Sequence, residues 1–151
     1  MKTQSFIWRK INRVGLLIIA DLVIGCEYIP FSSGKLEGRI INPPSDWNLV
    51  LNEEIIQVET NPEEPYSVNL WIVNIDNTPH IFSGDNLSQW AKNILKNDKV
   101  RLKIGENIYP LRATRVVETE RFEQFARGWD EKYGHRPLNE NLTETYLFQL
   151  N

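Results

Sequence analysis

Short connections between the predicted strands constrain the fold of this chain more than any other feature. Stretches rich in β-branched and aromatic residues, several of them with alternating polarity, predict strands at 54–60, 66–75, 80–83, 99–104, 108–117 and 145–150. Short turns join most of them, whereas parallel strands need crossovers of a dozen residues or more. The sequence therefore predicts antiparallel pairing, and six such strands favour a small closed barrel, which leaves no unpaired edge.

Two helices are predicted between the strands. The first follows Asp85, a candidate N-cap whose carboxylate accepts from backbone N–H groups. Its apolar stripe at helical spacing consists of Leu87, Trp90, Ala91, Ile94 and Leu95. The second follows Thr119, another candidate cap, and ends at Gly134, because glycine tolerates the left-handed conformation at a helix end. The predicted fold class is mainly β, a six-stranded antiparallel barrel with two helices.

The first 25 residues carry a distinct pattern. Four basic residues and no acid precede Val14, and an apolar run then leads to Gly25 and to Cys26, the only cysteine of the chain. A basic segment, a short apolar segment and small residues before a cut form the secretory pattern. With Cys26 after the cut, the pattern resembles a bacterial lipoprotein signal peptide. Asp21 departs from it, since a carboxylate is costly inside an apolar segment.

This resemblance implies a location and a division of the chain. It implies cleavage before Cys26, lipid such as palmitate on Cys26, and a protein anchored in the bacterial cell envelope that faces the periplasm or the exterior. The chain then comprises a signal peptide (1–25), a tether (26–35) and one domain (36–151), which is long enough for a single core. The alternatives are an uncleaved anchor helix, and a buried first helix with an ordinary core cysteine.

Charge and composition exclude several classes of function. The chain is acidic, with a net charge of −3 at pH 7, and loss of the basic leader makes it more so. Such a surface does not attract phosphate backbones, so we expect no nucleic-acid binding. His80 and His135 lack cysteines or paired acids at ligand spacing, so no metal site is predicted. The basic residues of strand 99–104 are interpreted as a solvated outer face.

One series of motifs extends over residues 46–133. A strand ending in Thr60 precedes a proline-rich loop and a Ser-x-Asn-Leu-Trp strand, and a hairpin leads to Phe82-Ser83. A helix with Trp90-Ala-Lys-Asn-Ile-Leu then leads into Asn97-Asp98-Lys-Val. This order resembles the pyridoxamine-phosphate-oxidase-like split-barrel superfamily, including its deazaflavin-dependent nitroreductase-like branch. The resemblance implies a homodimer with a flavin-type cofactor, FMN or a deazaflavin, at its interface.

The resemblance also implies cofactor-binding residues. The candidate polar contacts are Thr60, Ser67, Asn69, Ser83, Ser88 and Lys92. The candidates to flank a ring are Trp71 and Trp90. The alternatives are a solvated lysine at 92 and core or dimer packing for the two tryptophans. One departure matters: Asp85 places an acid near the expected phosphate position, where a basic pair is usual. No catalytic acid or base is identified.

Two functions remain open at this point. The first is a flavin- or deazaflavin-dependent oxidoreductase exported as a lipoprotein, in which the cofactor carries the hydride chemistry. The second is a non-catalytic envelope lipoprotein, whose barrel binds a small ligand or haem, or serves as a dimeric scaffold. The fold alone does not separate them.

Overall fold

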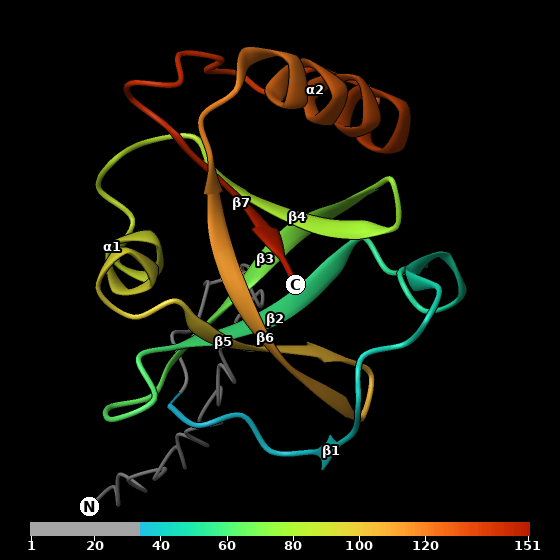
Figure 1. The fold of residues 1–151 in the computed structure, drawn as a ribbon, viewed down its shortest axis with the longest axis vertical. Coiled ribbons are helices and arrows are strands. Elements are labelled where there is room, and N and C mark those ends of the chain that lie inside the picture. The colour runs from blue at the N-terminus through green and yellow to red at the C-terminus, as the bar shows by residue number, and fades with distance from the viewer. Residues whose placement is uncertain (1–33) are drawn as a thin grey trace, which may run out of the picture.

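The computed structural model describes residues 34–151, which are drawn in colour in Figure 1. The predicted signal peptide, Cys26 and most of the predicted tether lie outside the described residues. Within residues 34–151, none of the helices has the length and apolar character needed to cross a membrane.

The sheet closes on itself (Figure 1). Its barrel strands are β2 (Ile55–Thr60), β3 (Tyr66–Ile75), β4 (Thr78–Ser83), β5 (Lys99–Ile104), β6 (Asn107–Val116) and β7 (Tyr146–Leu150). They follow the order β6-β5-β2-β3-β4-β7, and β7 pairs back with β6. All of these pairs are antiparallel, which confirms the predicted six-stranded antiparallel barrel. A further two-residue strand, β1 (Arg39–Ile40), pairs in parallel with β6.

Two long strands bridge the two halves of the barrel. Residues 66–71 of β3 pair with β2, and residues 72–75 pair with β4. In the same way, residues 107–112 of β6 pair with β5, and residues 113–116 pair with β7. The barrel is therefore two half-sheets that share β3 and β6. Asp76 and Asn77 both have positive φ, at 50° and 59°, which suits the tight turn between β3 and β4.

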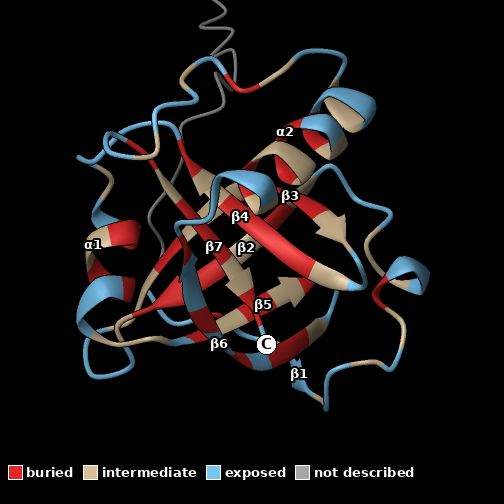
Figure 2. Ribbon diagram, turned by 45° about the horizontal axis from the view of Figure 1, so that its top comes forward, coloured by how far each residue is buried: buried red, intermediate tan, exposed pale blue. Residues whose placement is uncertain are grey.

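Alternation along the strands fills the barrel with apolar side chains. In β5, Val100, Leu102 and Ile104 are buried, as the alternation predicts. Each contributes about 1.5–3 kcal/mol relative to an exposed side chain. They share one cluster with Ile56, Val58, Ile72, Ile81, Phe148 and other residues of the barrel. Figure 2 shows the buried residues concentrated on the strands and on the inner sides of the helices.

The helix α2 (Thr119–Tyr133) packs on the outside of the barrel and forms a second core. Its buried side chains are Phe122, Phe125, Ala126 and Trp129. At Gly128 the helix approaches β3 so closely that an added Cβ would lie 2.7 Å from Ile75 Cδ1. Gly134 ends the helix in the left-handed conformation, as predicted. The predicted cap was wrong: Glu118 is the N-cap residue, and its side chain makes no capping bond.

The helix α1 (Gln89–Lys96) covers the barrel beside β2 and β3. It begins later than the apolar stripe predicts, so Leu87 precedes the helix and is exposed, and Leu95 is half exposed. The predicted cap is also wrong, because Ser88 is the N-cap residue and makes no side-chain capping bond. The Asp85 carboxylate instead stabilises the turn before the helix, where it accepts from the Leu87 and Ser88 N–H groups.

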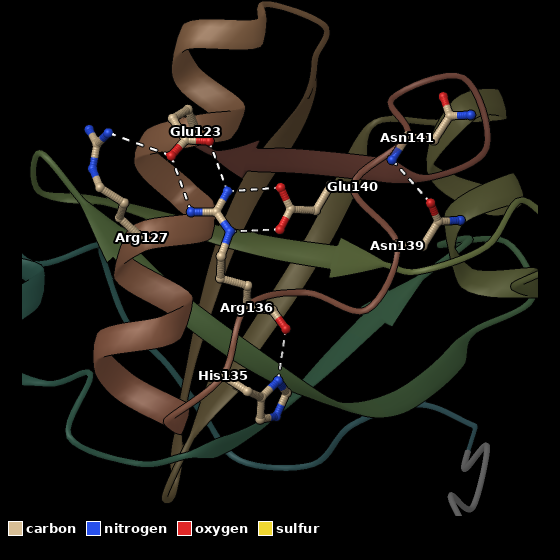
Figure 3. A network of polar contacts seen from close by, with 7 residues as sticks. All are labelled: Glu123, Arg127, His135, Arg136, Asn139, Glu140 and Asn141. Carbon is tan, nitrogen blue, oxygen red and sulfur yellow. Dashed lines mark hydrogen bonds and ion pairs between the residues drawn. The ribbon is translucent and has the colours of Figure 1, made fainter.

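Arg136 fixes the segment between α2 and β7 (Figure 3). Its guanidinium donates to both carboxylate oxygens of Glu123 on α2 and to both of Glu140 in the segment. The guanidinium lowers the pKa of both carboxyls, so they stay ionised at neutral pH. Because these side chains face solvent, the network adds little stability. Its role is to set the path of the chain toward β7.

Candidate functional site

A pocket of about 570 Å³ lies against the part of the sheet formed by β2, β5 and β6. The end of β2, the start of β5 and the middle of β6 form its walls. Its apolar lining includes Pro62, Pro65, Val100, Pro110 and Leu111. Sites for small ligands are typically concave, mostly apolar and about 300–1,000 Å³ in volume. This pocket has the size and surface of such a site.

The pocket is basic although the chain is acidic. Its lining contains the basic residues Lys35, Lys99, Arg101 and Arg112 and a single acidic side chain, that of Glu59. Arg101 pairs with Glu59, and Arg112 pairs with Asp98. Neither Lys35 nor Lys99 forms an ion pair with any residue in 34–151. A concave surface lined by one sign of charge attracts the opposite charge. The pocket therefore suits a ligand with an apolar body and an anionic group.

A buried ion pair forms one wall of the pocket. Glu59, 5% exposed, accepts from Arg101 Nε at 2.7 Å and from Arg101 Nη2. The Glu59 carboxylate also accepts from the Leu36 N–H, and Arg101 Nη2 donates to the Leu36 carbonyl at 3.1 Å. The pair thereby holds the first described residues against β2 and β5. This contact places the neighbouring Lys35 at the pocket.

Thr60 is the one predicted site residue that lines this pocket. Its side chain is buried, donates to the Tyr66 carbonyl at 3.2 Å, and accepts from Asn93 Nδ2 at 3.1 Å. Ser67, also buried, donates its hydroxyl proton to the Gly34 carbonyl. The Thr60 hydroxyl therefore links β3 to helix α1, and the Ser67 hydroxyl binds the main chain at Gly34.

Asn69 and Trp71 lie on the outer face of the barrel. Asn69 and its cross-strand partner Gln57 line a second, smaller pocket of about 310 Å³ together with Lys103. Neither amide side chain forms a hydrogen bond within residues 34–151. Trp71 is 40% exposed and stacks on Tyr133, with ring centroids 4.6 Å apart and an interplanar angle of 16°. This face combines an aromatic surface with two available amides.

Ser83 and Ser88 meet in the turn before α1. Their hydroxyl oxygens are 2.7 Å apart, and Ser83 Oγ donates to the Asp85 carbonyl at 2.8 Å. The Asp85 carboxylate already accepts from the N–H groups and the hydroxyl that an incoming phosphate would need. A second anion at this turn would meet like charge. The residues of this turn therefore do not fit the phosphate of an FMN-type cofactor.

The last two predicted residues lie on α1. Trp90 is 5% exposed and packs in the barrel core, with its ring centroid 5.9 Å from that of Phe148. Lys92 is partly buried and lies on the same helix. The eight predicted residues are therefore distributed over the pocket, the outer face, the turn before α1 and the core.

Most of the residues that line the larger pocket are not among the eight that the sequence predicts. The alternation in 99–104 correctly placed Lys99 and Arg101 on the outer face of the strand. It did not show that the proline-rich loop 61–65 and Lys35 would lie beside these side chains and form a pocket with them. The signal available was the charge imbalance, because basic side chains cluster here on an acidic chain. Residues 34–151 contain no group of three or more side chains placed to hold a metal ion.

Comparisons with known proteins identify the fold. No protein-family model and no curated protein sequence matches the chain. Campylobacter jejuni ChuZ is similar in structure, with a TM-score of 0.58 and 15% identity over 69% of this chain, which spans 50% of the ChuZ chain. A pyridoxamine 5'-phosphate oxidase candidate from Listeria innocua has a TM-score of 0.53 and 10% identity over 69% of this chain and 87% of its own.

A third match is described as a domain-swapped dimer, with a TM-score of 0.50 and 16% identity over 68% of this chain and 83% of its own. Identities this low establish a shared fold and nothing about activity. The fold expected from the motifs in residues 46–133 is nevertheless confirmed. This chain has the split-barrel fold of the pyridoxamine 5'-phosphate oxidase-like proteins.

Proposed function

We propose that this protein binds a small anionic ligand with an apolar, planar body, of the haem or flavin class, in the larger pocket. The observation that carries the proposal is the combination of an apolar lining with four basic side chains in a pocket of about 570 Å³. Lys99 and Lys35 are the cations available to pair with the anionic group. The three prolines supply apolar surface for the body of the ligand.

The pocket is built on rigid parts of the fold. Val100 and Leu111 come from adjacent strands, where they are directly paired, and both are buried. The positive charge of Arg101 compensates the negative charge of Glu59, so the Glu59 carboxylate does not repel an incoming anion. The acceptor groups of a ligand would therefore meet Lys35 and Lys99 at the rim. Charge-assisted bonds of this kind contribute about 1.5–3 kcal/mol each.

A flavin- or deazaflavin-dependent oxidoreductase is the second candidate function. The observation that favours it is the outer face, where Trp71 and Tyr133 present an aromatic surface beside the Gln57 and Asn69 amides. A flavin bound there would supply hydride transfer, and these residues would bind and orient its ring. This candidate implies a homodimer, for which the match to a domain-swapped dimer is the support.

Titration of the purified full chain with haem, FMN and a deazaflavin tests both candidates. Absorption spectra report binding, and two lysines on the same strand provide matched variants. We expect saturable binding of one ligand, with a dissociation constant raised about tenfold by Lys99→Ala, because a charge-assisted bond is lost. Lys103→Ala, which changes the smaller pocket, should leave binding unchanged.

The opposite effects of the two lysine substitutions on binding would place the ligand outside the larger pocket. Binding that survives Lys99→Ala but is weakened by Lys103→Ala and by Trp71→Ala would place the ligand at the smaller pocket beside Trp71 and would favour the oxidoreductase. If none of the three ligands binds, the proposed function is wrong and the scaffold hypothesis takes its place.

We also propose that the protein is anchored in the cell envelope through lipid on Cys26. The support is the sequence pattern that ends at Cys26. Radiolabelled palmitate supplied to bacteria expressing the full chain should label the protein, and Cys26→Ser should abolish the label, because the thiol is the acceptor. Label that persists in Cys26→Ser would contradict the proposal, as would an unlabelled wild-type protein.

A further inference from the structure

The turn between β4 and α1 contains three hydrogen-bond donors that converge on one carboxylate oxygen. The Leu87 and Ser88 N–H groups point to one oxygen, Asp85 Oδ1, at 2.8 and 3.0 Å. The Ser88 hydroxyl lies 3.2 Å from the same oxygen. Backbone N–H groups and hydroxyls at the start of a helix are the groups that bind phosphate in many proteins. In this chain an internal carboxylate takes all of them.

The carboxylate at this position is ionised and exposed to solvent. Hydrogen bonding from the Leu87 N–H lowers the pKa of Asp85, and bonding from Ser88 and the charge of Lys92 act in the same direction. At neutral pH the turn therefore already contains its negative charge. The positive charge of Lys92 favours this ionised form of Asp85.

We propose that Asp85 is a built-in substitute for a phosphate group and that it closes this turn to phosphorylated ligands. A phosphate that entered would have to displace the Asp85 carboxylate from its two N–H donors. It would also meet the charge of that carboxylate at close range, and such like-charge contacts discriminate strongly between ligands. Asp85 is therefore a specificity-determining residue that acts by exclusion.

This inference goes beyond the proposed function and does not depend on it. It concerns a turn that lines neither pocket. Its consequence for ligand choice is that any phosphate-bearing ligand must place its phosphate elsewhere, for example near Lys99. Ring compounds without a phosphate are not excluded by Asp85.

Inorganic phosphate and residue-specific NMR provide the direct test. In the assigned ¹H–¹⁵N spectrum of the full chain, we expect the Leu87 and Ser88 amide signals to show no saturable shift as phosphate is added. In Asp85→Ala, where the carboxylate is absent and both N–H donors are released, the same two signals should shift saturably. Asp85→Gly provides a second variant with the same expectation.

Asp85→Asn is the matched control. Its amide oxygen still accepts from the two N–H groups, although the charge is gone, so occupation of the donors predicts no response to phosphate. Saturable shifts at Leu87 and Ser88 in the wild-type protein would overturn the proposal. So would the absence of any response in both Asp85→Ala and Asp85→Gly. The proposed function is tested separately by ligand titration, so the two can fail independently.

Discussion

Replacing Glu59 by alanine is expected to lower the free energy of unfolding by about 3 kcal/mol, because it leaves the partly buried Arg101 guanidinium without its partner. The side chains of Arg101 and Glu59 are only 19% and 6% exposed, so solvent does little to compensate. The Leu36 N–H also loses its acceptor. Urea unfolding of the full chain, followed by tryptophan fluorescence, measures the change.

Two further variants separate charge from packing at this pair. Glu59→Gln keeps an acceptor for the Leu36 N–H and should cost less than Glu59→Ala. The double variant Glu59→Leu with Arg101→Met removes both charges, and buried pairs replaced in this way are often neutral in stability. It should therefore be more stable than Glu59→Ala. A Glu59→Ala protein as stable as the wild type would show that the pair contributes nothing.

The stability of the fold is expected to fall as the pH decreases from about 6.5 to about 4, because of His80. Its side chain is fully buried against Phe125, Nδ1 lies 2.8 Å from the Thr78 carbonyl, and Nε2 has no hydrogen-bond partner. Burial lowers the pKa of His80 to about 4, and the hydrogen bond to Thr78 offsets part of that effect. The charges of Arg121 and Asp76 act in opposite directions.

The sign follows from proton binding in the two states. Well above pH 6.5 His80 is neutral in both states, so the full stability is present. Between pH 6.5 and 4 the unfolded chain binds a proton at His80 that the folded chain excludes. The free energy of unfolding therefore decreases with falling pH, by a total of about 3 kcal/mol once the pH is below 4.

Thermal unfolding of three proteins across this pH range tests the assignment. His80→Leu cannot be protonated and should flatten the dependence between pH 6.5 and 4.5, above the range in which most carboxylates titrate. His135→Gln removes the only other histidine, which is exposed, and should leave the dependence unchanged. If wild type and His80→Leu show equal slopes, His80 is not the group responsible.

Local patterns predicted the strands of the barrel well. Alternation identified Val100, Leu102 and Ile104 as inward-facing, and short turns required antiparallel neighbours. Helix ends were predicted less well. Asp85 and Thr119 have the residue types of caps, but Ser88 and Glu118 are the N-cap residues. Packing of Trp90 and Phe122 against the barrel, which single-sequence patterns do not contain, outweighs a capping bond of about 1 kcal/mol.

The sequence by itself determined the strand periodicity, the antiparallel pairing and the two amphipathic helices, because each depends on residues close together in the chain. Only the tertiary structure decided the site. Barrel closure brings Lys35, Thr60, Lys99 and Arg112 around one pocket, although they are far apart in sequence. The Glu59–Arg101 pair depends on the register of β2 against β5. Such contacts follow from long-range packing, which no local spacing records.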